Sequence, residues 1–233
     1  MREETGRPAT EAGMTAETEE PAAAGAFPRA FRAELTRLFR LRRDVRHFRE
    51  DPVPPALLDR CLGAFASAPS VGLSEPWRIL SVASPEARQK ALANFTASNR
   101  AALAGYSGEK ARLYASLKLS GMREAPVQLA VFCDETTAKG AGLGATTMPE
   151  MRRYSVVAGI MAFWLMARAK GLGVGWVSIL DPERLARDLA VDENWRLVAY
   201  LCIGWPKAWE ERPELEKVGW EERNPALARP ITR

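Results

Sequence analysis

The spacing of apolar residues divides the chain into helical and extended segments. Apolar side chains at positions 31, 35, 38 and 39 recur at the interval of a helix face, and a long apolar run that ends at Gly171 predicts a core helix. Another helix is predicted between Pro55 and Pro69, because proline is common at a helix start and shortly after its end. Extended segments are predicted at residues 77–84, 125–134, 174–180 and 195–206.

Two further helix starts carry a specific signal. Ser84 stands before Pro85, and Asp181 stands before Pro182. A serine or aspartate side chain caps the free N–H groups of a first helical turn, and proline fits the first helical position. The pattern therefore predicts helices that begin at these two places.

Helices and strands alternate along the chain, which predicts a central sheet covered by helices, in class α+β or α/β. The length of 233 residues and the hydrophobic fraction of 47% are typical of one domain with an ordinary core. The start of the chain is rich in Ala, Glu, Thr and Pro and has little to bury. We therefore predict a disordered acidic tail over residues 1–28 and a single domain over residues 29–233.

Several classes of protein are disfavoured by composition. The sequence has no apolar run long enough for a membrane span and begins without the apolar stretch of a secretory signal, so a cytoplasmic protein is predicted. The three cysteines lack CxxC spacing and are interpreted as buried small side chains. His47 is the single histidine, which argues against a zinc site built on histidines, and no metal is predicted.

Charge is distributed unevenly. The net charge is +4, but residues 1–26 carry −4, so the remainder carries +8, mostly from arginine. A basic body indicates either nucleic acid or a phosphorylated small molecule as partner. Acidic residues are interleaved with the arginines, as in "ERLARDLAVDENWR". This pattern does not favour nucleic-acid binding.

The stretch "RRDVRHFR" at Arg42–Arg49 sets four arginines around Asp44. Arginine forks match phosphate oxygens in bidentate geometry, which makes the cluster a candidate anion site. A solvated basic face, with Asp44 as a salt-bridge partner, is the alternative. We expect Arg42, Arg43 and Arg46 to span about one helical turn near a helix end.

Two glycine-containing loops are also candidates. "APSVGLSEPWR", from Ala68, can direct backbone N–H groups at a ligand, and Gly72 allows close approach, although a plain helix-to-strand connection has the same composition. "GAGLGA" at residues 140–145 has GxGxG rather than GxGxxG spacing and is a weak dinucleotide signal. "GLGVGW" at residues 171–176 is interpreted as a helix end followed by a tight turn.

An ordered series of motifs extends this interpretation. "RRDVR-F", "APSVGLS-PWR", "TMPEMRRYSVV", "GLGVGWVSILDP", "YLCIGW" and "RPELEKVGW" together resemble the flavin-dependent nitroreductase superfamily over roughly residues 35–222. Within it the sequence is similar to the 5,6-dimethylbenzimidazole synthase family. Asp44 supports this branch, because ordinary nitroreductases carry serine at that position. Glu75 departs from the pattern, which has glutamine there, and adds a negative charge beside the loop.

The resemblance implies an α+β fold with a mixed or antiparallel sheet flanked by helices, in an intertwined homodimer that binds FMN at its interface. By motif, the arginine cluster would hold the FMN phosphate and nearby flavin groups, the second loop would face the ring, and the segment after "GWV" would approach the flavin from the other side. The residues implied are Arg42, Arg43, Asp44, Val45 and Arg46; Pro69, Ser70, Gly72 and Leu73; Ser178 and Ile179; and Arg212 as an additional phosphate ligand.

The implied reaction is the oxygen-dependent fragmentation of reduced FMN to 5,6-dimethylbenzimidazole, the lower ligand of cobalamin, and erythrose 4-phosphate. FMN is then a substrate, O₂ a co-substrate, and a separate flavin reductase one source of the reduced flavin. The resemblance makes Asp44 and Ser178 the catalytic residues. A carboxylate in place can act as the general base that removes a proton from carbon.

Two other functions share much of this pattern. One is a conventional FMN-dependent nitroreductase that uses NAD(P)H, and the other is a flavin-binding protein without activity. Asp44 and the "TMPEM" segment favour the synthase. The insert between Ala91 and Ala125 is interpreted as a lid that shields the reaction from water.

Overall fold

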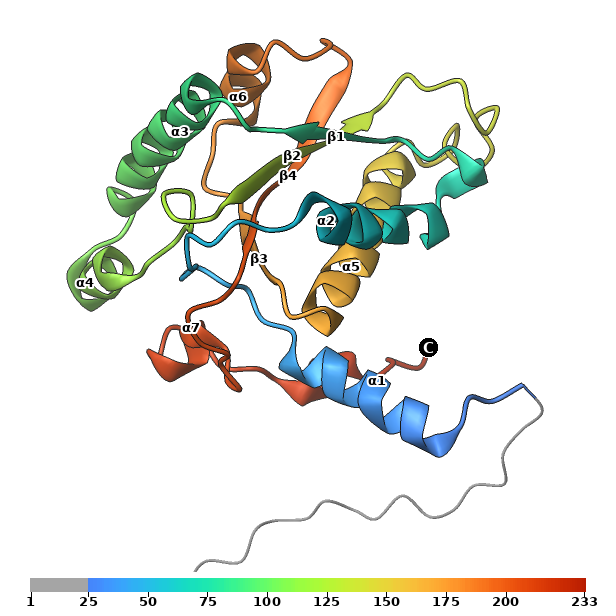
Figure 1. The fold of residues 1–233 in the computed structure, drawn as a ribbon, viewed down its shortest axis with the longest axis horizontal. Coiled ribbons are helices and arrows are strands. Elements are labelled where there is room, and N and C mark those ends of the chain that lie inside the picture. Colours follow the sequence, from blue (N-terminus) through green and yellow to red (C-terminus); the bar gives the residue numbers. More distant parts are fainter. Residues whose placement is uncertain (1–24) are drawn as a thin grey trace, which may run out of the picture.

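The computed structural model describes residues 25–233, so most of the predicted tail at 1–28 lies outside it. A four-stranded sheet forms the centre of the molecule (Figure 1). Its strands lie in the order β1-β2-β4-β3, and every neighbouring pair is antiparallel. The strand bounds are β1 Trp77–Ser81, β2 Val127–Asp134, β3 Gly173–Val177 and β4 Trp195–Gly204. The predicted α+β class is confirmed, and the sheet is antiparallel rather than mixed.

The two central strands send alternate side chains to opposite faces of the sheet. In β2, Leu129 and Val131 belong to one buried cluster, whereas Ala130 and Phe132 belong to the other. The same alternation continues in β4. Successive side chains of a strand point to opposite faces, so a sheet buried on both sides needs apolar residues at nearly every position. This explains the continuous apolar runs at 129–133 and 197–203.

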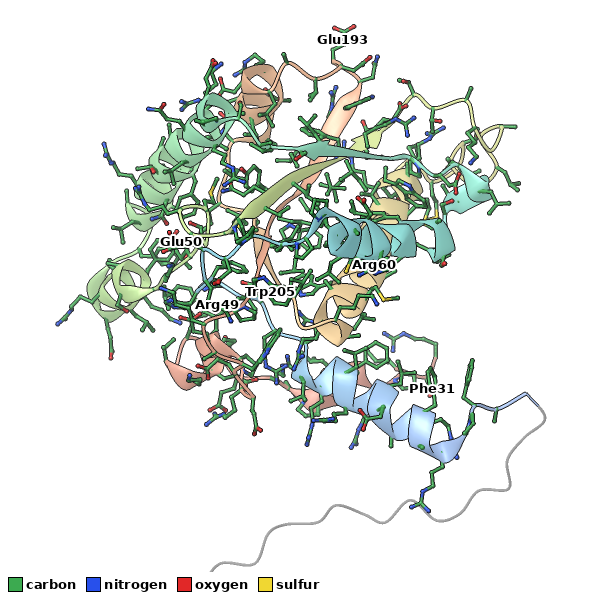
Figure 2. All side chains as sticks on the ribbon, in the orientation of Figure 1. Phe31, Arg49, Glu50, Arg60, Glu193 and Trp205 are labelled. Carbon is green, nitrogen blue, oxygen red and sulfur yellow. The ribbon has the colours of Figure 1, made fainter. Side chains whose placement is uncertain are left out.

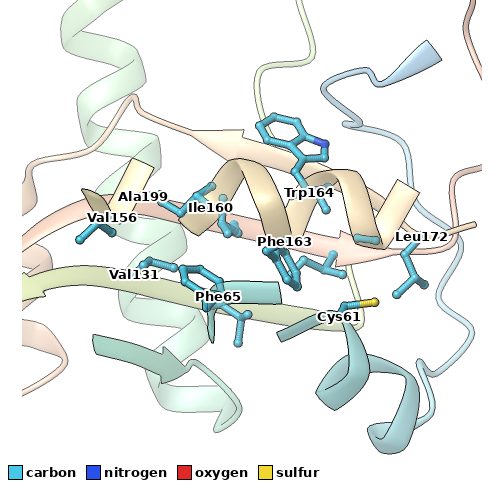
Figure 3. Packing of buried hydrophobic residues seen from close by; sticks show 14 of the residues in the cluster. Cys61, Phe65, Val131, Val156, Ile160, Phe163, Trp164, Leu172 and Ala199 are labelled. Carbon is cyan, nitrogen blue, oxygen red and sulfur yellow. The ribbon is translucent and has the colours of Figure 1, made fainter. Parts of the chain in front are cut away.

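One face of the sheet is covered by α2 (Pro55–Leu62), η1 (Gly63–Ser67) and α5 (Met151–Ala169) (Figure 1). Figure 3 shows α5 lying along the sheet, with Ile160 and Phe163 packed near Phe65 of η1. The buried residues of α5 recur at helical spacing: Val156, Ile160, Phe163, Trp164 and Ala167. The predicted core helix is therefore confirmed, and it ends just before Gly171.

The other face is covered by α3 (Pro85–Leu103) and α6 (Pro182–Asp188), with α4 (Gly108–Ser116) beyond the end of α3. Both predicted caps are present. The Ser84 hydroxyl accepts a hydrogen bond from the Ala87 N–H at 3.2 Å, and the Asp181 carboxylate accepts one from the Arg184 N–H at 2.9 Å. The predicted insert from Ala91 is shorter than expected, because residues up to Leu103 continue α3.

The ends of the described chain lie together below the sheet in Figure 1. They comprise α1 (Arg29–Leu41), α7 (Glu214–Lys217) and η3 (Pro225–Ala228). Phe31 of α1 has its side chain on the surface (Figure 2), and it is half exposed. Among residues 25–233 none of the helices is long and apolar enough to cross a membrane.

The prediction that Arg42, Arg43 and Arg46 span a helical turn is wrong. Helix α1 ends at Leu41, and Arg42 already has extended backbone angles. Beyond it, Asp44 forms a parallel bridge with Val174 of β3. The backbone groups of this segment find partners on β3 instead of in a further helical turn, and this is why the chain extends here.

Candidate active site

The arginine-rich segment lies as an extra extended piece beside β3. The Val45 N–H donates to the Val174 carbonyl at 3.0 Å, and the Val45 side chain is buried in the core. Gly175 makes this approach possible, because a methyl group there would collide with the Val45 carbonyl oxygen. Figure 2 shows where the segment ends, with Arg49 beside Trp205, whose carbonyl accepts the Arg49 N–H at 2.8 Å.

The Asp44 carboxylate is held on both oxygens. Oδ1 accepts the backbone N–H of Trp176 at 2.8 Å, and Oδ2 accepts Arg46 Nε at 2.9 Å. Arg46 also donates to the Lys118 carbonyl at 3.2 Å and lies 3.9 Å from Glu214. A carboxylate with one backbone and one guanidinium donor has a defined orientation. Asp44 is half-buried, so it remains accessible to a ligand.

Arg42 and Arg43 have different surroundings. The Arg42 guanidinium stacks on the Trp164 ring of α5, 4.7 Å from its centroid, and burial lowers its pKa while Asp44 opposes the shift. Arg43 is buried and donates to the Arg42 carbonyl at 2.7 Å and to the Glu211 carbonyl. Burial, together with the positive charges of Arg223 and Arg42, lowers the pKa of Arg43. Two guanidiniums held so close together favour an anion beside them.

A cavity of about 310 Å³ lies between this segment and the C-terminal part of the chain. Basic side chains from both parts surround it, and it also has acidic groups and one tryptophan. Its lining comprises Arg43, Asp44, Val45, Arg46, His47, Lys207, Ala208, Trp209, Glu210, Arg212, Glu214 and Lys217. Arg212, predicted from its motif, therefore lies with the arginine cluster. Lys207, Lys217 and Glu214 are wall residues that sequence reasoning missed, because only the fold brings them to residues 43–47.

Ser178 follows directly after β3 and is exposed, and Ile179 beside it is half-buried. Trp176, whose N–H binds Asp44, stands two residues earlier on the same strand. The two predicted catalytic residues are thus both positioned by β3, Asp44 through a hydrogen bond and Ser178 through chain continuity.

The second predicted loop has a strained backbone. Gly72, Leu73 and Glu75 all have positive φ angles, of 56°, 54° and 42°. Such angles in residues other than glycine cost about 1–3 kcal/mol each and are common at functional sites. The loop is tied to α5, because the Val71 N–H donates to the Ser155 hydroxyl at 3.0 Å. Leu73 projects into solvent with 74% of its surface exposed.

Glu75 and Gly72 connect this loop to residues 136–149. The Glu75 carboxylate forms an ion pair with Lys139, so its negative charge has a partner. Gly72 packs against the Gly140 carbonyl, and Gly140 has no room for a side chain beside Gly72. The "GAGLGA" stretch therefore serves as a close-packed support for the loop. A dinucleotide site of the parallel-sheet type is excluded here, because the sheet is antiparallel.

One chain does not bring the two halves of the predicted site together. The loop at residues 69–73 contacts α5 at Ser155. The end of α1 contacts α5 at Arg168, whose side chain donates to the Leu41 carbonyl at 3.4 Å. These positions are thirteen residues apart, about 20 Å along a helix. Figure 1 shows η2 (Val71–Leu73) at the right edge and the end of α1 below the sheet. Pro69, Ser70, Gly72 and Leu73 thus lie away from the arginine cluster.

The chemistry of the cavity fits a phosphorylated ligand. Its walls carry five Lys or Arg side chains, and Arg43 Nε is buried without a hydrogen-bond partner among the described residues. An unpartnered buried donor beside a basic cavity is explained by a missing acceptor. The carboxylate of Asp44 in the same wall offers a proton acceptor. The arrangement can therefore hold an anion and accept a proton from the molecule that carries it.

Comparison with known proteins adds to this description. The sequence profile of the Nitroreductase family matches residues 40–205. A protein of Rhodospirillum rubrum named 5,6-dimethylbenzimidazole synthase is 53% identical, over 85% of this chain and 94% of the relative. A protein of the same name from Rhodobacter capsulatus is 46% identical, over 85% of this chain and 96% of the relative.

Solved structures show the same fold. An iodotyrosine deiodinase bound to FMN and 3-iodo-L-tyrosine superposes with a TM-score of 0.67 at 22% identity, over 85% of this chain and 97% of the other. A putative NAD(P)H:FMN oxidoreductase of Staphylococcus epidermidis gives a TM-score of 0.63 at 18% identity, over 84% and 95%.

Proposed function

The chain belongs to the nitroreductase family and, within it, to the 5,6-dimethylbenzimidazole synthases, and on that premise we propose that it makes the lower ligand of cobalamin by fragmenting FMN. In the proposed reaction, reduced FMN and O₂ yield 5,6-dimethylbenzimidazole and erythrose 4-phosphate, and the pyrimidine part of the flavin ring leaves as a third, oxidised fragment. FMN is then consumed as a substrate.

One observation carries this proposal beyond the family. The Asp44 carboxylate stands in the wall of the basic cavity, with its orientation set by the Trp176 N–H and by Arg46. A phosphate clamp alone needs no carboxylate, and Asp44 differs from Glu210 and Glu214 of the same wall because a backbone N–H also binds its side chain. A carboxylate fixed among arginines is explained by a proton that must be taken from the bound molecule.

The phosphate end of FMN is proposed to occupy the cavity. Arg43 and Arg212 both line it, and Lys207 adds a third positive charge. The volume of about 310 Å³ is at the lower end of the range for small-molecule sites, about 300–1,000 Å³. It therefore suits the ribityl phosphate, and the flavin ring needs further walls.

Asp44 is proposed to remove the proton from carbon that fragmentation requires. Its anchored oxygens restrict it to one orientation, which lowers the entropic cost of proton transfer. Ser178 is proposed to donate or accept a hydrogen bond near the same atoms, because β3 positions both residues. Bound FMN supplies the reactive ring, and the protein supplies orientation, a base and exclusion of water.

A second copy of the chain is proposed to complete the site. The loop at 69–73 is bound to α5 at Ser155, whereas the Leu41 carbonyl just before the arginine cluster is bound at Arg168, about 20 Å farther along the helix. Exposed apolar side chains follow α1 and α5: Phe31, Leu35, Phe39, Tyr154, Val157, Met161 and Met166. Several large apolar side chains exposed on the same two helices favour a protein interface there. A homodimer through these helices would set the loop of one chain over the cavity of its partner.

The proposal is tested by mixing the purified protein with chemically reduced FMN, admitting air, and measuring 5,6-dimethylbenzimidazole by chromatography and mass. We expect the product to appear as FMN disappears. In parallel, NAD(P)H oxidation with a nitroaromatic acceptor tests for conventional reductase activity. Intact FMN recovered after reoxidation, with rapid NAD(P)H turnover, would contradict the proposal and identify a reductase.

A further inference from the structure

Asn94 of α3 is completely buried, and both ends of its amide bind the backbone of one residue. Nδ2 donates to the Asp181 carbonyl at 2.9 Å, and Oδ1 accepts the Asp181 N–H at 2.8 Å. Ser98 adds a longer bond to Oδ1 at 3.4 Å. A side-chain amide that pairs with both the N–H and the carbonyl of one residue binds it as a neighbouring β-strand would. The position and the direction of the Asp181 backbone are therefore both fixed.

Asp181 closes the segment that begins at Ser178. Upstream, Val177 is paired with Tyr200 in the sheet. Downstream, the Asp181 carboxylate caps α6 through the Arg184 N–H. Residues 178–180 therefore run between two anchored points, the end of β3 and the backbone bound by Asn94.

The Asn94 bonds bear directly on where Ser178 stands. Ser178 is exposed and forms no side-chain hydrogen bond among the described residues, so its place depends on the backbone around it. Without the amide, the Asp181 N–H would lose its partner, and the Asp181 carbonyl would keep only the Leu185 N–H at 3.0 Å, so the segment would lose its two bonds to the buried side of α3. The segment would then relax toward water and carry Ser178 with it.

We propose that Asn94 is a positioning residue for the reaction, which holds the segment 178–181 so that Ser178 and Ile179 meet the flavin at fixed places. This inference rests on the proposed function. Asn94 itself touches neither the arginine cluster nor the cavity.

The test compares Asn94→Leu, which has the same branched shape but forms no side-chain hydrogen bonds, with the wild type. We expect FMN affinity within about threefold, because the phosphate cavity is formed by other segments. We expect the yield of 5,6-dimethylbenzimidazole per reduced FMN to fall at least about tenfold, because small displacements of a reacting group have large effects on rate. The lost yield should return as oxidised FMN and hydrogen peroxide, the two-electron products of direct reaction with O₂.

Gln128→Leu is the matched control. Gln128 is also buried, donates to the Met122 carbonyl at 2.7 Å and accepts the Tyr200 hydroxyl at 2.6 Å, but it does not bind the segment 178–181. We expect it to lower thermal stability and to leave the yield per FMN unchanged. Asn94→Asp keeps an acceptor for the Asp181 N–H and loses the donor to the Asp181 carbonyl, so an intermediate yield is expected. If Asn94→Leu does not fold, Asn94→Asp is compared with Gln128→Leu in its place.

Hydrogen exchange supplies a readout that is independent of turnover. In the wild type, oxidised FMN should slow amide exchange in residues 178–181, and in Asn94→Leu this protection should be lost while that of β4 remains. Unchanged yield in Asn94→Leu, or an equal loss of yield in Gln128→Leu, would overturn the inference. If the wild type makes no product but FMN still slows exchange at residues 178–181, the proposed function is refuted and the inference is not. If FMN does not slow exchange at residues 178–181 in the wild type, the inference is refuted and the proposed function is not.

Discussion

Replacement of Asp44 by asparagine separates the role of the carboxylate in chemistry from its role in structure. The amide oxygen of the introduced asparagine can still accept the Trp176 N–H, so the bond at 2.8 Å is preserved. The charged bond to Arg46 at 2.9 Å is lost, although Arg46 keeps the Lys118 carbonyl at 3.2 Å. The shape of the side chain is nearly unchanged. The substitution therefore removes a negative charge and a proton acceptor while the surrounding contacts remain.

The two effects differ in size. A hydrogen bond to a charged group contributes about 1.5–3 kcal/mol when shielded from water. The Asp44 side chain is 31% exposed, so solvent screening reduces the loss to about 1 kcal/mol. In a chain of this length that lowers Tm by about 2–4 °C. Loss of a general base lowers the rate by about 10²–10⁴-fold, which corresponds to at least about 2.7 kcal/mol.

The assay measures Tm, FMN affinity and product formation in the same preparations. Asp134→Asn is the control, because Asp134 forms a comparable ion pair with Arg78 at 2.6 Å, away from the cavity. We expect both variants to lose similar stability and only Asp44→Asn to lose product. Product formation by Asp44→Asn at the wild-type rate would refute the assignment of Asp44 as the base.

Two further predictions concern binding and pH. Arg42→Lys is expected to weaken FMN binding about tenfold, because lysine keeps the charge but lacks the planar fork that stacks on Trp164. Fluorescence titration with FMN measures the affinity, and Arg37→Lys, at an exposed position of α1, is the control. An equal loss of affinity in Arg37→Lys would contradict the prediction. Burial raises the pKa of the Glu124 carboxyl, but its hydrogen bond to Lys118 and the positive charges of Lys118 and Lys207 together outweigh burial, and the pKa is lowered overall. The stabilisation is therefore present above the unfolded pKa of about 4.3 and is lost as pH falls through the folded pKa. Thermal unfolding is measured between pH 3 and pH 7, a range from roughly one unit below the unfolded pKa to well above it. We expect Glu124→Gln to have a lower Tm than the wild type at neutral pH and the same Tm in acid. A difference in Tm that does not change with pH would contradict this coupling between protonation and stability.

Local sequence signals predicted much of the fold. The caps at Ser84 and Asp181 depend on neighbouring residues alone, and both helices begin where these signals stand. The apolar run of α5 likewise predicted a buried helix. Helix α4 was missed, because its short sequence has a weak apolar pattern and its position depends on contacts with distant residues such as Trp220.

The site was harder to predict because its geometry is non-local. The backbone at Arg42–Arg46 was expected to be helical, but pairing with β3 makes it extended. The motif predicted Arg212 for the phosphate site, and the fold places it in the cavity, whereas no local pattern singled out Lys207. The motifs also gave no indication that the loop at 69–73 lies on the other side of the same chain. That separation follows from the length of α5.

The fate of the carbon atoms of FMN shows directly whether the flavin itself is the substrate. Reduced FMN labelled with ¹³C at the ribityl carbon attached to the ring is supplied to the protein in air, and the 5,6-dimethylbenzimidazole is analysed by mass. We expect one labelled carbon in each product molecule and loss of one FMN for each product formed. Unlabelled product, or FMN that survives while other substrates turn over, would contradict the claim that the flavin itself is the substrate.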